Sequence, residues 1–117
     1  MAGWLSTHVL DTAKGCPAEG IKITLYKING NSREKLIECV TNADGRTDAP
    51  ILPEDKFQTG TYELVFYAGD YLRASGQVSE ETLFLDEIPI RFGMNEENHY
   101  HVPLLLSAYG YSTYRGS

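Results

Sequence analysis

Apolar and polar residues alternate with a period of two in several short segments of the chain. In segment 21–25, three aliphatic side chains alternate with Lys22 and Thr24, which is the pattern of a strand with one buried face. Six further segments rich in β-branched and aromatic residues have the length of strands: 5–11, 34–41, 61–67, 88–92, 99–107 and 109–114. These seven or eight short strands predict an all-β sandwich.

Glycine and proline separate the predicted strands. Turns are expected at 14–17, 29–31 and 42–45, where Gly45 supplies the positive φ angle that a tight turn needs. Pro89 cannot donate a backbone hydrogen bond, so segment 88–92 is expected at the edge of a sheet. Segment 69–76 lacks the two-residue period and is the place where one short helix is predicted.

Length and charge restrict the class of protein. The 117 residues suit one domain that covers residues 1–117. A net charge of −6 without a local basic cluster argues against a nucleic-acid or anionic membrane partner. No apolar run approaches the roughly 20 residues of a membrane span. The first residues lack the pattern of a signal peptide, so a cytoplasmic location is expected. Cys16 and Cys39 are expected to be free thiols without a metal or catalytic role.

Strand parity predicts where the three histidines point, because alternate side chains of a strand face opposite sides of the sheet. In segment 5–11, His8 lies opposite the more apolar side. In segment 99–107 the even-numbered residues form an apolar face, which leaves His99 and His101 on the other side. All three imidazoles are therefore expected on the outer face of a sheet.

The same outer faces carry an apolar set that a monomer would seldom leave in water, namely Trp4, Leu10, Pro103 and Leu105. A second subunit is expected to cover these residues, which predicts a homo-oligomer. A groove formed where such faces meet would hold imidazoles in partly dry surroundings, and this environment suits general acid–base catalysis.

The spacing of His99 and His101 also fits a metal site, since two histidines at positions i and i+2 of one strand can both bind zinc. His8 would then be the third ligand, and the protein would be a zinc-dependent hydrolase. The composition offers no other unusual ligand set. This function stays open as an alternative.

Four motifs give the chain a resemblance to a known family. They are LSTHVLD at 5–11, DGR at 44–46, HYHVPLLLS at 99–107 and YRGS at 114–117, of which the terminal tetrapeptide is the most specific. Together they resemble the 5-hydroxyisourate hydrolase family, the transthyretin-related enzymes of urate breakdown, and the resemblance extends over essentially the whole chain. Transthyretin shares the fold but lacks this set of motifs, so the resemblance favours the enzyme over the hormone carrier.

The resemblance implies a transthyretin-like sandwich of two four-stranded sheets. It also implies a homotetramer, a dimer of dimers with active sites at the dimer–dimer interface. The implied reaction is the hydrolytic opening of 5-hydroxyisourate to 2-oxo-4-hydroxy-4-carboxy-5-ureidoimidazoline, with no metal and no organic cofactor. The motifs carry the family's functional positions onto His8, Arg46, His101 and Ser117, with Tyr114 as a substrate contact and His99 outside the set.

Hydrolysis of an acyl–nitrogen bond needs a base for water, a donor for the developing oxyanion and an acid for the leaving nitrogen. His101 is the expected base or proton relay, and His8 is its partner in orienting water or substrate. Arg46 is the cation expected to face the oxyanion. Ser117 would bond substrate or water through its hydroxyl or terminal carboxylate. A transthyretin-type module, which binds a flat aromatic ligand between subunits without chemistry, is the second alternative.

Overall fold

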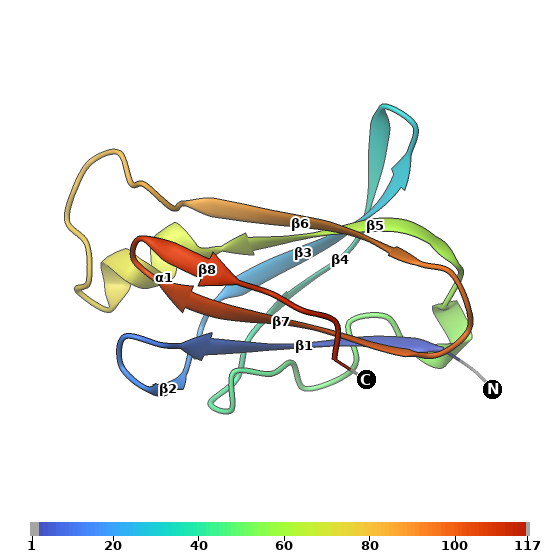
Figure 1. The fold of residues 1–117 in the computed structure, drawn as a ribbon, viewed down its shortest axis with the longest axis horizontal. Helices are drawn as coiled ribbons and strands as arrows, with labels where there is room; N and C mark the ends of the chain where they lie inside the picture. Colours follow the sequence, from blue (N-terminus) through green and yellow to red (C-terminus); the bar gives the residue numbers. More distant parts are fainter. Residues whose placement is uncertain (1–2, 117) are drawn as a thin grey trace.

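The computed structural model describes residues 3–116 and contains two four-stranded β-sheets that form two layers (Figure 1). One sheet contains β1 (Trp4–Asp11), β2 (Cys16–Pro17), β7 (His99–Ser107) and β8 (Gly110–Ser112). The other contains β3 (Lys22–Asn29), β4 (Ser32–Val40), β5 (Gly60–Tyr67) and β6 (Glu87–Met94). The remaining elements are the 3₁₀ turn η1 (Glu54–Lys56) and the helix α1 (Ala68–Ala74). The predicted all-β sandwich with one short helix is confirmed.

The first sheet brings distant parts of the chain together. Its strand order is β2-β1-β7-β8, and β1 runs parallel to β7 while the other pairs are antiparallel. The second sheet has the order β4-β3-β5-β6 and is antiparallel throughout. Because β1 and β7 are neighbours at the centre of their sheet (Figure 1), the LSTHVLD and HYHVPLLLS motifs lie side by side.

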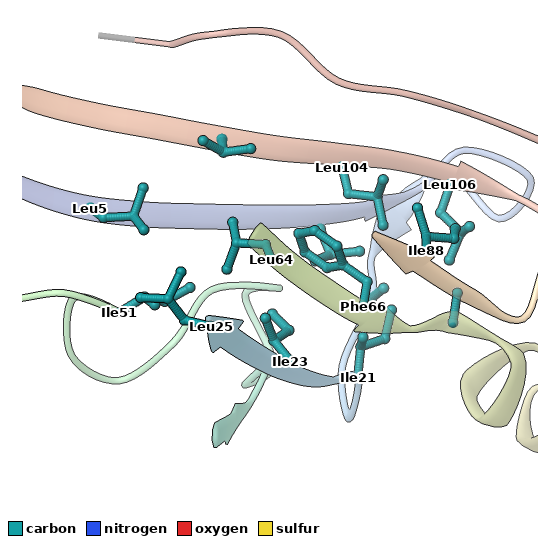
Figure 2. Close-up of a cluster of buried hydrophobic side chains, with 14 of the residues drawn as sticks. Leu5, Ile21, Ile23, Leu25, Ile51, Leu64, Phe66, Ile88, Leu104 and Leu106 are labelled. Atoms are coloured by element: carbon teal, nitrogen blue, oxygen red, sulfur yellow. The ribbon is translucent and has the colours of Figure 1, made fainter. Parts of the chain in front are cut away.

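The core lies between the two sheets and is built from the apolar faces of their strands (Figure 2). Burial alternates along β1, where Leu5 and Val9 are fully buried, as a two-residue period predicts. Leu104 and Leu106 of β7 extend this layer, and Phe66 of β5 contributes from the opposite sheet. The alternate positions of β1 and β7, which carry all three histidines, consequently face away from the core.

The outer face of the first sheet is more covered than the sequence indicates. Pro103 is buried within the chain, and its carbonyl oxygen accepts a hydrogen bond from the Thr113 hydroxyl at 2.7 Å. Trp4, Leu10 and Leu105 are half-buried. The expectation of an exposed apolar set is therefore wrong for Pro103, because the segment that follows β8 returns along β7 and covers it.

Local predictions are confirmed at a strand edge and at the helix. Strand β6, which contains Pro89, lies at the edge of its sheet. Helix α1 overlaps the predicted segment 69–76 but begins one residue earlier and is shorter, because Gly76 reverses the chain with a φ angle of 77°. No helix within residues 3–116 is long and apolar enough to cross a membrane.

The cysteines are both free, as the sequence predicts. Cys16 is not in a simple turn, however, because Cys16–Pro17 forms the short edge strand β2 that pairs with the end of β1. Burial raises the pKa of the half-buried Cys39 thiol, with a smaller contribution from the charge of Glu38. A raised pKa makes this thiol a weak nucleophile at neutral pH.

A buried carboxylate ties α1 to β1. Asp11 is 1% exposed and accepts hydrogen bonds from the Tyr71 hydroxyl at 2.6 Å, the Gln77 amide at 2.9 Å and the Lys14 backbone amide at 2.9 Å. Burial by itself would raise the pKa of Asp11, but the hydrogen bonds outweigh it and lower that pKa. Burial and the contact with Asp11 raise the pKa of Tyr71 well above its usual value. The hydrogen bonds of Asp11 therefore connect α1 and the segment after it to the end of β1.

Candidate active site

A cavity of about 460 Å³ opens on the outer face of the first sheet. A volume of this size suits a small-molecule ligand. The cavity combines two imidazoles and one guanidinium, which makes it the candidate active site. Its lining comes from β1, from β7 and from the loop between β4 and η1: Trp4, Ser6, Thr7, Arg46, Thr47, Asp48, Ala49, Pro50, His99 and His101.

Strand register puts the cavity side chains next to one another. Trp4 pairs with His99, and Ser6 pairs with His101, across the parallel β1–β7 ladder. All four residues occupy outward positions, so neighbouring side chains on the two strands come into contact. A slip of either strand by one residue would turn its side chains to the other face. The register of β1 on β7 therefore builds the site.

Ser6 links the two histidines of the cavity. Its Oγ lies 2.8 Å from Nε2 of His99 and 2.8 Å from Nδ1 of His101. The His99 ring stacks on Trp4, with ring centroids 3.6 Å apart and planes inclined by 6°. These contacts fix both imidazoles and leave Nε2 of His101 without a hydrogen-bond partner among the residues that the structure describes.

Asn42 shapes the turn that presents Arg46. Its Oδ1 accepts hydrogen bonds from the backbone amides of Asp44 at 2.9 Å and Arg46 at 3.2 Å. Gly45 has a φ angle of 74°, as predicted, and a side chain there would collide with the Val9 carbonyl oxygen. The Val9 amide donates a hydrogen bond to the Gly45 carbonyl at 2.8 Å. The turn is therefore docked on β1, and it brings the exposed Arg46 to the cavity.

His8 lies on the same outward face of β1 but outside the cavity lining. Its Nε2 is 2.9 Å from the Asp44 carbonyl oxygen. Because a carbonyl can only accept, this nitrogen of His8 carries the proton. The contact joins β1 to the turn that presents Arg46. The structure thus brings Arg46 and His101 to one cavity and places His8 beside it.

Gly116, the last residue that the structure describes, pairs with His101. The Gly116 amide donates a hydrogen bond to the His101 carbonyl at 2.7 Å, and the His101 amide donates to the Gly116 carbonyl at 3.3 Å. A β-carbon on Gly116 would come within 2.9 Å of Cδ2 of His101, so the imidazole packs where a side chain would stand. The Arg115 guanidinium lies 4.3 Å from the centroid of the Tyr100 ring. Ser117, which follows this anchored segment, lies outside the described residues.

Tyr114 is not brought to the histidine cavity within one chain. Its side chain is 60% exposed and lines a separate cavity together with residues of β6 and β7, including Tyr100 and Val102. The substrate contact that the sequence predicts for Tyr114 is therefore not formed in the single-chain cavity.

Both histidines of the cavity have lowered pKa values. Burial lowers the pKa of His101, and charge repulsion from Arg46, His99 and His8 lowers it further. Burial also lowers the pKa of His99. Both rings are therefore mainly neutral at pH 7, and a neutral imidazole is the form that acts as a general base.

The zinc alternative requires His8, His99 and His101 to form one ligand set. Residues 3–116 contain no group of three or more His, Cys, Asp or Glu side chains arranged to hold a metal ion. His99 and His101 direct nitrogens at the Ser6 hydroxyl, whereas His8 directs one at the turn before Arg46. The ligand set that the zinc alternative requires is therefore not formed among these residues.

The sequence interpretation missed part of the cavity. It left His99 outside the functional set, whereas the structure places His99 in the cavity lining with its Nε2 beside the Ser6 hydroxyl. It assigned Ser6 no role. The available signal was parity, because Ser6 and both histidines alternate with core residues. Pairing between β1 and β7 could not be read from the sequence, since parallel register between distant segments has no local signature.

Comparisons with known proteins agree with the fold. Residues 5–116 match the model of the HIUase/Transthyretin family. The chain is 61% identical over 115 residues to the 5-hydroxyisourate hydrolase of Mesorhizobium japonicum. The alignment covers 98% of this chain and 93% of that protein. It resembles the structure of the Klebsiella pneumoniae 5-hydroxyisourate hydrolase (TM-score 0.80, 35% identity, 98% and 94% of the two chains). It also resembles sea bream transthyretin in complex with thyroxine (TM-score 0.84, 26% identity, 96% and 93%).

Proposed function

The chain belongs to the HIUase/Transthyretin family, and from this premise we propose that it hydrolyses 5-hydroxyisourate to 2-oxo-4-hydroxy-4-carboxy-5-ureidoimidazoline in urate degradation. The observation that carries the proposal is the cavity in which the neutral His101 imidazole shares the lining with the Arg46 cation. A base and a fixed positive charge are what hydrolysis of an acyl–nitrogen bond requires.

In the proposed reaction, water attacks a ring carbonyl carbon, and the ring carbon–nitrogen bond then breaks. His101 accepts the water proton at Nε2 while the water oxygen bonds to carbon. Arg46 stabilises the negative charge that develops on the carbonyl oxygen. His101 then returns the proton to the leaving nitrogen, so protons balance without a metal or an organic cofactor.

Three further residues have supporting roles in the proposal. His8 orients water or substrate from beside the cavity, and its bond to the Asp44 carbonyl joins it to the turn that presents Arg46. Ser117 bonds substrate or water, which is supported by the Gly116 bridge that brings the end of the chain to His101. Tyr114 contacts the substrate, and its exposure in one chain means that this contact needs another subunit.

The proposed assembly is a homotetramer, a dimer of dimers with active sites at the dimer–dimer interface. It is supported by a cavity that lies on an open sheet face and by exposed aromatic side chains that include Tyr111 and Tyr114. A neighbouring subunit would exclude water from the cavity, which strengthens the attraction between Arg46 and an oxyanion. The proposed location is the cytoplasm, and nucleic acid and membranes are not proposed as partners.

A transthyretin-type binding protein is the second candidate, favoured by the similarity to the thyroxine complex of sea bream transthyretin. This function would use the sandwich and an intersubunit ligand site but no base. The Arg46 and His101 pair has no task in such a protein. The two candidates therefore differ in whether a flat ligand is bound unchanged or is hydrolysed.

The test follows the ultraviolet decay of freshly generated 5-hydroxyisourate with and without the purified protein. The proposed function predicts faster decay with the protein, and a His101→Ala variant that folds normally but turns over about 10²-fold more slowly. A Ser79→Ala variant, on an exposed loop outside the cavity, serves as the control. A wild-type protein that binds iodinated thyronines tightly and leaves the decay unchanged would support the binding function instead.

A further inference from the structure

The Ser6 hydroxyl is shared between two imidazoles that are both mainly neutral at pH 7. Its oxygen lies 2.8 Å from Nε2 of His99 and 2.8 Å from Nδ1 of His101. A hydroxyl has one proton to donate and lone pairs with which to accept. Ser6 Oγ makes no other hydrogen bond within residues 3–116, so its own proton finds an acceptor there only when the hydroxyl donates to one imidazole and accepts from the other.

This proton count links the tautomers of the two histidines. In one arrangement, Nδ1–H of His101 donates to Ser6, and Ser6 donates to Nε2 of His99. In the other, Nε2–H of His99 donates to Ser6, and Ser6 donates to Nδ1 of His101. The first arrangement leaves a free lone pair on Nε2 of His101, whereas the second places a proton there. Only the first has a base at Nε2 of His101, the nitrogen that makes no hydrogen bond within residues 3–116.

We propose that Ser6 and His99 are positioning residues that hold His101 as the Nδ1–H tautomer, so that Nε2 is the free base. This inference rests on the proposed function, because it takes His101 as the base. His99 fulfils the role by accepting the Ser6 proton at Nε2. The outward register of β1 against β7 provides the geometry, since it pairs Ser6 with His101 and Trp4 with His99.

Trp4 fixes the ring that accepts the Ser6 proton. The near-parallel stack at 3.6 Å holds the plane of His99 and keeps its Nε2 directed at Ser6. Burial lowers the pKa of His99, which favours the neutral ring that can accept a hydrogen bond. The indole therefore acts on His101 indirectly, through His99 and Ser6.

The hydrogen bonds from His101 to Ser6 and from Ser6 to His99 also persist while the base gains and loses its proton. When Nε2 of His101 takes the proton from water, Nδ1–H continues to donate to Ser6, and Ser6 continues to donate to His99. The positive charge on His101 is then solvated by a hydroxyl dipole that is already oriented, at no cost of reorganisation. When Nε2 returns the proton to the leaving nitrogen, all three residues are back in their starting state.

Matched substitutions separate the hydrogen bond from packing. Ser6→Ala removes the hydroxyl, whereas Ser6→Thr keeps it. His99→Phe keeps an aromatic ring on Trp4 but has no acceptor, whereas His99→Gln loses the ring but retains an acceptor near the position of Nε2. Ser79→Ala, on an exposed loop outside the cavity, is the control.

Two readouts test the proposal: two-bond proton–nitrogen correlation spectra of the imidazoles, and kcat and KM for 5-hydroxyisourate. We expect wild-type His101 to show a protonated Nδ1 and an unprotonated Nε2. Ser6→Ala and His99→Phe should disturb this tautomer and lower kcat about 10-fold with little change in KM. Ser6→Thr and His99→Gln should restore most of the loss.

A wild-type His101 with its proton on Nε2 would overturn the proposal, as would wild-type tautomer and kcat in both Ser6→Ala and His99→Phe. Failure of the proposed function gives a different result, because the wild-type protein would then leave 5-hydroxyisourate unchanged whatever tautomer its spectra show.

Discussion

Strand β1 carries two polar clusters that differ in how completely they are bonded. The inward cluster centres on Asp11, whose carboxylate accepts hydrogen bonds from three groups while it is 1% exposed. The outward cluster centres on Ser6, which contacts two imidazoles at the floor of a cavity. Both clusters use short, direct hydrogen bonds, but only the outward one leaves a basic nitrogen, Nε2 of His101, without a partner among the described residues.

The difference shows how one strand serves both stability and chemistry. A buried carboxylate whose two oxygens accept three hydrogen bonds is held in place, and it fixes the helix against the sheet. An imidazole held from one side only is oriented by its partner and free on the other side. Because β1 alternates between the two faces, the two clusters share one strand but have no hydrogen-bond partner in common.

The largest predicted effect is on catalysis. Arg46→Ala should lower kcat/KM for 5-hydroxyisourate about 10²-fold or more, because the developing oxyanion loses its fixed cation. Arg46→Lys should recover part of the activity, since it keeps the charge but loses the two-pronged donor geometry. The free energy of unfolding should stay close to the wild-type value, because Arg46 is exposed.

Arg33→Ala is the control for this prediction, since Arg33 is also exposed but pairs with Glu63 outside the cavity. Equal activity losses in Arg33→Ala and Arg46→Ala would show that net charge matters and that the position of Arg46 does not.

Loss of a hydrogen bond in the inward cluster should lower stability and leave catalysis nearly unchanged. Tyr71→Phe is expected to lower the free energy of unfolding by about 2 kcal/mol, because the Asp11 carboxylate stays buried and loses a donor, and to leave kcat within about twofold of wild type. The lowered Asp11 pKa gives stabilisation that is present above the unfolded value of about 3.9 and is lost as pH falls through the folded value. The difference between variant and wild type should therefore shrink in acid.

Urea unfolding at several pH values measures this effect. Tyr26→Phe is the matched control, because the half-buried Tyr26 hydroxyl makes no hydrogen bond within residues 3–116. If Tyr71→Phe lowers kcat as strongly as it lowers stability, the two clusters are not independent and the comparison fails.

A smaller effect is expected at the end of the chain. Gly116→Ala should reduce kcat about 10-fold, because a β-carbon there approaches Cδ2 of His101 to 2.9 Å and must displace the imidazole. Gly93→Ala is the matched control, since a β-carbon at that position meets nothing within 4 Å. Wild-type turnover in Gly116→Ala would show that the Gly116 bridge does not position His101.

Much of the fold could be predicted because its signals are local. Two-residue alternation gave the strands and their buried faces, Pro89 gave the edge of the second sheet, and the loss of period gave the helix near 69–76. Burial of Pro103 could not be predicted, because the segment that covers it returns from β8 through contacts that no local pattern specifies.

The site was predicted less completely, for a similar physical reason. Parity placed His8, His99 and His101 on outer faces, and the motifs selected Arg46 and His101, which do meet in one cavity. The partnership of Ser6 with His99 depends on the parallel register of β1 and β7, which brings together residues from opposite ends of the sequence. Ser117 lies outside the described residues, so its role stays a prediction.

The central claim is that His101, neutral and next to Arg46, is the base for hydrolysis of 5-hydroxyisourate. The most direct measurement is kcat/KM for this substrate as a function of pH. Since burial and the neighbouring Arg46, His99 and His8 lower the pKa of His101 from its usual 6.5, activity should be level at neutral pH. It should fall only as pH drops below 6.5 and the base becomes protonated. His101→Ala should lose this acid limb together with most of the activity. An acid limb that is centred above 6.5, or that persists in His101→Ala, would contradict the account.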